Sequence, residues 1–380
     1  MKSADPKSGF FVQGVGAVTP LGANAEQTWD ELVRGAEAVR QPLPKGFGGR
    51  TYYYSAVPPK FTAAAGRQPR LRRSGDISLL GVTAGLAALA DAGIPLEEAK
   101  QGAVVFAIAC GGVVYTRRFY NEVVTEGANA ASPLLFPETV YNAPASHLAA
   151  LLKIDGRDYT LVGDSSVGLS ALHFASQLLA LDPALPFCVV VGVEEADWVL
   201  ADGFAAWRMA SNRNSFPVFG AKQGTILAES AASVVLSRSG SLRLVRTSPG
   251  LPFFSQREAP AVLQEVVTKT CGEHQPAGIL CSANGTFADR AEEIVFRSAL
   301  GTVPVYAHKP AIGDSLGASA LLQLVLAKFA LAQQKLPPTL HAGDRLQTVT
   351  REVTEIRGNE ILITSVGFNQ QVNAALVAAE

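Results

Sequence analysis

The segment Gly163–Gln177, G-D-S-S-V-G-L-S-A-L-H-F-A-S-Q, holds the residue best placed for chemistry, Ser165. A strand is predicted over Thr160–Val162, and the small, apolar residues from about Val167 to Leu181 predict a helix. Ser165 would then lie in the first helical turn, where unpaired amides and the helix dipole favour negative charge. A thiol there would ionise readily, whereas a serine hydroxyl needs a neighbouring base. Because Asp and Ser are both preferred helix caps, we expect Ser165, beside Asp164, to cap this helix.

The other chemically capable residues show no spacing that defines a site. The run G-V-G-A-V-T-P at Gly14–Pro20 lacks the third glycine of a dinucleotide-binding loop, so a tight turn is the better interpretation. His147 and His173 lie on apolar, helix-like segments and are expected to be satisfied core or surface histidines. The cysteines show neither metal-ligand nor C-x-x-C spacing, so we expect no metal site and mostly buried free thiols at Cys110, Cys188, Cys271 and Cys281.

Strand-like and helix-like runs alternate along the chain, which predicts an α/β fold with some antiparallel pairing. The order of elements restarts near Leu244, which suggests two similar halves, residues 9–240 and 241–380. Arg40–Tyr54 and Ser211–Gly224 are rich in Gly, Pro, Asn and polar residues and are predicted to be loops. Strands are expected near residues 105, 190, 235 and 280, with a last strand over 360–366, and helices over about 25–33, 77–92, 260–269, 289–299 and 316–334.

The composition limits the class of protein. The 380 residues are 48% hydrophobic and 17% charged, which suits a sheet covered on both faces. The formal net charge is −1, so nucleic acid is not an expected partner. The N-terminus shows no signal-type apolar core, and no uninterrupted apolar run approaches the length of a membrane span. We therefore expect a cytoplasmic protein without a membrane span.

Seven segments, in order from near residue 10 to near residue 377, resemble the β-ketoacyl–acyl carrier protein synthases, the thiolase-like condensing enzymes of fatty acid and polyketide synthesis. The segments are V-Q-G-V-G-A-V-T-P-L-G-A-N-A-E-Q-T-W-D-E-L, S-P-L-L-F-P-E-T-V-Y-N-A-P-A-S-H-L-A, S-S-V-G-L-S-A-L-H-F-A-S-Q, V-V-V-G-V-E-E, A-E-S-A-A-S-V-V-L, H-K-P-A-I-G-D-S-L-G-A-S-A and S-V-G-F-N-Q-Q-V-N-A-A-L-V. The resemblance implies a thiolase-like fold, in which two similar βαβαβαβ-type halves form five αβαβα layers, and it implies dimers.

At three positions the sequence departs from the active members of that family, which use one cysteine and two histidines. Ser165 stands at the cysteine position, Asn284 in S-A-N-G-T at the first histidine, and Asp314 in I-G-D-S-L-G at the second. An amide cannot take a proton, and a carboxyl with a reference pKa of about 3.9 is a poor base unless burial raises that pKa. An ionised Asp314 would also repel the enolate that condensation requires. Claisen condensation at this site is therefore not expected.

The resemblance also assigns supporting positions. Lys309 matches the family's lysine, and Glu229 lies in the segment that matches G-E-G-A. Phe368 matches the aromatic residue of G-F-G-G, whose amide completes the oxyanion hole in active members, but Asn369 and Gln370 replace the glycine pair. We expect Lys309 and Glu229 to form ion pairs or fix loops, and Phe368 to serve in packing.

The basic run Gly66–Arg73, G-R-Q-P-R-L-R-R, precedes a predicted helix. A solvated basic face is the simplest interpretation. In the resembled family, basic residues of this region meet the acidic carrier protein and its phosphopantetheine phosphate, so Arg70, Arg72 and Arg73 are candidate docking residues. No cofactor of the chain's own is expected; the phosphopantetheine arm of a partner acyl carrier protein would enter the site.

The resemblance and the three altered positions favour a non-condensing, ketosynthase-like subunit, similar to the chain-length factors of type II polyketide systems. Such a subunit pairs with an active ketosynthase as a heterodimer, shapes the acyl tunnel and handles carrier-bound acyl chains. One alternative is a Ser165-dependent acyltransferase or thioester hydrolase, with Asp314 as base and the amides of Ser165 and Phe368 as oxyanion donors. Another is an atypical β-ketoacyl synthase that uses serine.

Overall fold

The computed structural model describes residues 9–43, 49, 51–369 and 371–380. Gln370, one of the two residues that replace the family's glycine pair, lies outside these residues. Across the described residues one mixed sheet of eleven strands runs through the molecule, with two small sheets beside it.

The large sheet contains two sets of five strands with the same arrangement. The first set, in spatial order, is β5 (Asp158–Val162), β4 (Ala103–Ile108), β6 (Phe187–Glu194), β8 (Ser230–Ser237) and β1 (Phe10–Val18). The second set is β12 (Val305–Tyr306), β11 (Gly278–Leu280), β15 (Glu360–Val366), β16 (Gln371–Ala379) and β9 (Leu242–Thr247), with β10 (Leu251–Pro252) added beside β16. Numbered in chain order within its own set, each runs 3-2-4-5-1, with two parallel pairings followed by two antiparallel ones.

The two sets join where the first strands of both meet. β1 and β9 pair in antiparallel fashion, with Phe10 opposite Leu244 and Val12 opposite Leu242. The second half of the chain therefore repeats the topology of the first and continues its sheet. We keep residues 9–240 and 241–380 as the proposed limits of the halves.

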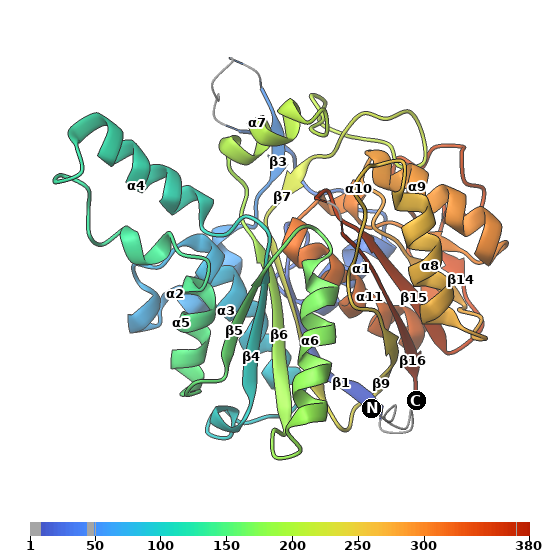
Figure 1. Ribbon diagram of the computed structural model, residues 1–380, viewed down its shortest axis with the longest axis horizontal. Helices are drawn as coiled ribbons and strands as arrows, with labels where there is room; N and C mark the ends of the chain where they lie inside the picture. The colour runs from blue at the N-terminus through green and yellow to red at the C-terminus, as the bar shows by residue number, and fades with distance from the viewer. Residues whose placement is uncertain (1–8, 44–48, 50, 370) are drawn as a thin grey trace.

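Two helices lie between the two strand sets. α6 (Val167–Leu181) packs on β4, β6 and β16, while α11 (Ser319–Gln333) packs on β8 and β15 and against α6. The outer layers are α3 (Asp76–Asp91) and α5 (Ala143–Leu152) over the first set, and α8 (Ala259–Cys271) with α9 (Phe287–Val295) over the second (Figure 1). The result is the five-layered αβαβα arrangement that the resemblance implied.

The composition of the central helices explains their burial. Both are rich in Ala and Leu, as a helix covered on all sides must be. The window Leu316–Gln333 even has the length and hydropathy of a membrane span, but 78% of it is buried within the fold. Its one charged residue, Lys328, reaches Asp91 at 2.6 Å. This segment is therefore a core helix.

The remaining elements lie at the ends and edges of the sheet. α4 (Val113–Glu126) stands away from the body in Figure 1 and contains no buried residue. α7 (Trp198–Ala206) is capped by Asp197, which accepts a hydrogen bond from the amide of Val199 at 3.0 Å. The others are α1 (Ala25–Val33), α2 (Ala63–Gly66), α10 (Lys309–Ile312), β2 (Gln41–Pro42), β3 (Tyr53–Ser55), β7 (Leu227–Ala228), β13 (Lys335–Leu336) and β14 (Thr354–Glu355).

The sequence-based boundaries hold for the principal helices, and α6 spans the predicted Val167–Leu181. Two expectations are wrong. β15 is not the last strand, because β16 follows it and lies inside the sheet. The described part of the predicted loop Arg40–Tyr54 contains β2 and most of β3, which pair with each other. No helix was predicted over α4, which has no apolar face buried in this chain. The four cysteines are free thiols, as expected.

Candidate functional site

Ser165 lies in the turn between β5 and α6, where the sequence placed it, and is 2% exposed. Its Oγ has no hydrogen-bond partner among the described residues. The prediction that Ser165 caps α6 is therefore wrong. The N-cap residue of α6 is Ser166, which makes no side-chain capping hydrogen bond. Asp164 Oδ1 accepts from the amide of Ser166 at 2.9 Å and from its hydroxyl at 2.7 Å, directly before the helix.

The second oxygen of Asp164 holds a distant loop. Oδ2 accepts hydrogen bonds from the amides of Asn369 at 3.1 Å and Gln371 at 3.2 Å. Burial raises the pKa of Asp164, although the hydrogen bonds from Ser166, Asn369 and Gln371 oppose that rise. The start of α6 and the segment after Phe368 therefore meet at one carboxyl group.

Asn284 and Asp314 are in direct contact. The Asn284 side-chain amide donates to Asp314 Oδ2 at 2.8 Å, and its carbonyl oxygen accepts from the Thr286 hydroxyl at 2.5 Å. Asp314 Oδ1 lies 3.1 Å from the Lys309 ammonium and accepts from the Ser319 hydroxyl at 3.1 Å. The predicted ion-pairing role of Lys309 is thereby confirmed.

This group settles the charge of Asp314. Burial alone would raise its pKa, but the Lys309 ammonium and the Asn284 amide outweigh burial and hold the pKa below its usual value. The side chains of Asn284, Lys309 and Ser319 all donate to its oxygens, which suits an ionised carboxylate. Asp314 is therefore an anion at neutral pH and a poor proton acceptor.

His308, which the sequence analysis did not select, lies close enough to Lys309 and Asp314 to be affected by their charges. It is buried, and its Nε2 has no partner among the described residues. Burial and the charge of Lys309 lower its pKa to about 3. The sequence feature that could have identified His308 is its position directly before Lys309. His147 Nε2 lies 2.7 Å from Glu138 Oε1, but its Nδ1 is buried without a partner among the described residues, so the expectation of a satisfied histidine holds for one ring nitrogen only.

Phe368 serves in packing and Glu229 fixes a loop, as predicted. The Phe368 ring packs against Phe204 at 5.1 Å and Trp207 at 6.1 Å between centroids. A hollow of about 380 Å³ lies beside it and is also lined by Phe253. Glu229 accepts from the amide of Val57 at 2.9 Å and so fixes that loop, while burial raises its pKa to about 7.

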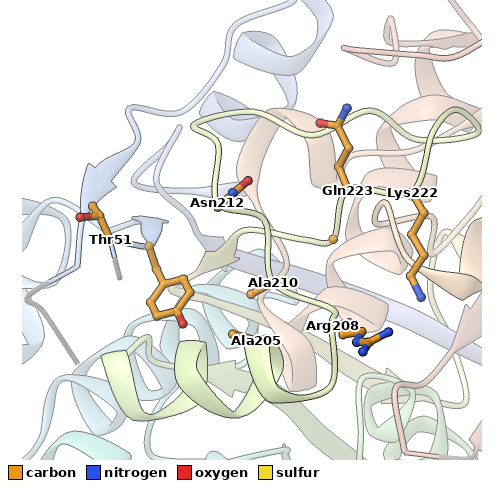
Figure 2. A pocket seen from close by; sticks show the side chains of 9 residues that line it. Thr51, Ala205, Arg208, Ala210, Asn212, Lys222 and Gln223 are labelled. Carbon is orange, nitrogen blue, oxygen red and sulfur yellow. The ribbon is translucent and has the colours of Figure 1, made fainter. Parts of the chain in front are cut away.

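Two groups of basic residues lie on the surface. Arg70, Arg72 and Arg73 are exposed, as a solvated basic face requires. A separate hollow of about 770 Å³ carries Arg208 and Lys222, and Figure 2 shows the Lys222 side chain extending toward Arg208. Sequence reasoning did not select these two residues, because only the fold brings the chain around 51, 208 and 222 together.

The altered positions do not form one connected group. Asn284, Asp314 and Lys309 are joined, whereas Ser165 belongs with Asp164 and is linked to Ser365, whose hydroxyl donates to the Ser165 carbonyl at 3.3 Å. Among the hydrogen bonds of the described residues, none connects Ser165 to Asn284 or Asp314.

Comparison with known families agrees with this architecture. The family described as "Beta-ketoacyl synthase, N-terminal domain" matches residues 10–240, and "Beta-ketoacyl synthase, C-terminal domain" matches residues 260–343. These matches cover more than half of the chain. The chain belongs to the beta-ketoacyl synthase family.

Individual relatives are distant but cover almost the whole chain. A 3-oxoacyl-[acyl-carrier-protein] synthase 2 of Coxiella burnetii is 24% identical, over 95% of this chain and 96% of the relative. A solved complex of a ketosynthase with its chain length factor from Xenorhabdus doucetiae matches with TM-score 0.81 and 18% identity, over 100% of both chains. The ishigamide ketosynthase/chain length factor matches with TM-score 0.86 and 16% identity, over 98% of this chain and 99% of that one. The thiolase-like fold of the chain follows.

Proposed function

We propose that this chain is a cytoplasmic, non-condensing ketosynthase-like subunit of chain-length-factor type, within a type II polyketide or fatty-acid synthase. It pairs with an active ketosynthase and handles acyl chains on an acyl carrier protein. The observation that carries the proposal is the bonded group of Asn284, Asp314 and Lys309, which stands where the family's active members hold their two histidines.

Condensation requires hydrogen-bond donors that stabilise an enolate. The group of Asn284, Asp314 and Lys309 places a negative charge at this position instead. Asp314 is a buried anion, so a second negative charge beside it is disfavoured in a low-dielectric site. Asn284 already gives one of its two amide hydrogens to that anion. Ser165, at the nucleophile position, has no base bonded to its hydroxyl in the described structure.

The surface of the first half supports a protein partner. α4 and the segment after it expose large apolar side chains, among them Tyr120 (60% exposed), Val124 (81%) and Leu134 (64%). β5 is the terminal strand of the sheet and pairs only with β4 in the described residues, so its other edge is open. Exposed apolar side chains and an open strand edge are both features of protein interfaces. The solved complexes above, each a ketosynthase with a chain length factor, favour an active ketosynthase as the occupant.

Exposed cations support an acidic carrier protein as the second partner. Arg70, Arg72 and Arg73 could meet acidic side chains, and the hollow with Arg208 and Lys222 could take the phosphate of a phosphopantetheine arm. Phe368 and Trp207 border the neighbouring hollow and give the arm an apolar wall.

Co-expression with a ketosynthase that holds an intact Cys-His-His set tests the pairing. The two chains should co-elute as a heterodimer in size-exclusion chromatography. Val124→Asp, on α4, should abolish co-elution because it places a charge in the apolar surface. Val39→Asp is the matched control, since Val39 is also highly exposed (75%) but lies outside α4. A stable, condensing homodimer would overturn the proposal.

The acyltransferase alternative has one observation in its favour, the unpartnered, buried Ser165 hydroxyl. Its proposed base, Asp314, is ionised but engaged by Lys309, Asn284 and Ser319, which argues against proton transfer from Ser165. Incubation with an acyl-carrier thioester, followed by intact mass spectrometry, separates the two functions. An acyl adduct lost in Ser165→Ala would favour the alternative.

A further inference from the structure

Asp164 joins two parts of the chain that lie 205 positions apart. Its carboxylate accepts from Ser166 at the start of α6 and from Asn369 and Gln371 in the segment after Phe368. The segment closes on itself, because the amide of Gly367 donates to the Gln371 carbonyl at 2.7 Å. Gly367, Asn369 and Gln371 therefore lie around one buried carboxylate.

The approach of that loop is close enough to need a glycine. A Cβ atom at Gly367 would lie 1.8 Å from Asp164 Oδ2, well inside the contact distance of any side chain. The backbone of Gly367 therefore lies directly on the carboxylate. Asp164 is 2% exposed, so its charge is compensated by these hydrogen bonds rather than by water.

We propose that Asp164 supplies the anion of this site: its carboxylate takes the negative-charge position at the N-terminus of α6 and holds the loop after Phe368 through the amides of Asn369 and Gln371. A helix N-terminus stabilises an anion, whether a thiolate, an oxyanion or a carboxylate. Because Asp164 already supplies that anion, a second one at position 165 or at the adjacent amides is repelled. Asp164 is a positioning residue, which sets the electrostatics and the loop without touching a substrate.

This inference goes beyond the proposed function because it concerns the isolated chain and needs no partner. It predicts how a thiol would behave at position 165. At a helix N-terminus a cysteine thiol normally ionises well below its usual pKa of about 8.5. Beside an ionised Asp164, the thiol of Ser165→Cys should keep a pKa at or above that usual value.

The test is a pH titration of thiolate ultraviolet absorbance, taken as the difference between Ser165→Cys and the parent chain, whose four native thiols cancel. Adding Asp164→Asn, which keeps the shape and removes the charge, should lower the thiol pKa by about one unit or more, that is, raise the thiolate fraction at neutral pH about tenfold. Asp182→Asn is the matched control. It removes a carboxylate at the far end of the same helix and should leave the titration unchanged.

A depressed thiol pKa in Ser165→Cys alone would overturn the proposal, and this single variant keeps the Asp164 contacts. An unchanged pKa on adding Asp164→Asn would overturn it as well.

Hydrogen exchange gives a second readout for the loop. In Asp164→Ala the amides of Asn369 and Gln371 should exchange at least about tenfold faster, since their acceptor is lost. Unchanged exchange would show that the loop does not depend on Asp164. If the chain failed to pair with a ketosynthase, the expected thiol titration and the expected hydrogen exchange would not change, because both are measured on the isolated chain.

Discussion

Gly163–Ser165 and Gly313–Ser315 are the same tripeptide, Gly-Asp-Ser, and each precedes one of the two central helices. Asp164 receives only neutral donors, from Ser166 and from the amides of Asn369 and Gln371, and burial raises its pKa. Asp314 receives the Lys309 ammonium at 3.1 Å, and its pKa falls. The aspartates of the two identical tripeptides thus have pKa values shifted in opposite directions. The fold places a cation beside Asp314 and backbone amides beside Asp164.

The serines differ in the same way. Ser165 Oγ has no partner among the described residues, whereas Ser315 Oγ lies 3.3 Å from the Ser319 hydroxyl. In the second tripeptide, the side chains of both Asp314 and Ser315 have hydrogen-bond partners. In the first tripeptide, only the side chain of Asp164 has them.

The largest effect should come from removing the cation of the second tripeptide. Lys309→Met leaves Asp314 as an uncompensated buried charge and should lower the free energy of unfolding by about 3–5 kcal/mol. Urea denaturation measures this. Lys328→Met, which breaks an ion pair that is partly exposed, should cost no more than about 1 kcal/mol. Equal losses for the two variants would contradict the comparison.

Removing the anion of the first tripeptide should have the next effect. Asp164→Ala strands the donors of Ser166, Asn369 and Gln371 and should lower the free energy of unfolding by about 2 kcal/mol. The same denaturation experiment applies, with Asp182→Ala as the control because the Asp182 carboxylate is partly exposed. A change within about 0.5 kcal/mol would mean that the loop is held by other contacts.

The pH dependence of stability should have opposite signs at the two aspartates. Asp164 binds its proton more tightly in the folded state, so the advantage of the parent over Asp164→Asn should grow as pH falls through its raised pKa toward about 4. Asp314 binds its proton more weakly when folded, so the advantage of the parent over Asp314→Asn should shrink below about pH 4. Denaturation across the acid range gives both curves, and curves of the same sign would refute the assignment.

The serines give the smallest expected difference. Ser165→Ala removes a hydroxyl without a partner and should be neutral or slightly stabilising. Ser315→Ala breaks a buried contact with Ser319 and should cost about 1 kcal/mol. Thermal unfolding of the two variants in parallel compares their losses of stability. A larger loss for Ser165→Ala than for Ser315→Ala would mean that the Ser165 hydroxyl has a hydrogen-bond partner.

The sequence predicted what depends on local pattern. The start and end of α6 follow from its small, apolar residues, and the altered positions 165, 284 and 314 follow from motifs in order along the chain. The contact between Asn284 and Asp314 has no local signal, because it joins residues 30 positions apart.

Two failures have clear physical causes. β16 is rich in Ala and small residues, which carry little strand preference, and only its burial between β15 and β9 makes it a strand. Ser165 does not cap α6 because the helix begins later, with Ser166 as its N-cap residue. The Asn369 amide that bonds the neighbouring Asp164 lies 205 positions away. Long-range partners of this kind cannot be found from residue types alone.

The apolar segment Leu316–Gln333 has a consequence for biosynthesis. By hydropathy it could be taken up by the machinery that inserts proteins into membranes. Chains fold from the N-terminal side while they are made, and β6 and β8, on which α11 packs, are synthesised first. These strands, which help to bury the segment, are therefore synthesised before the segment itself.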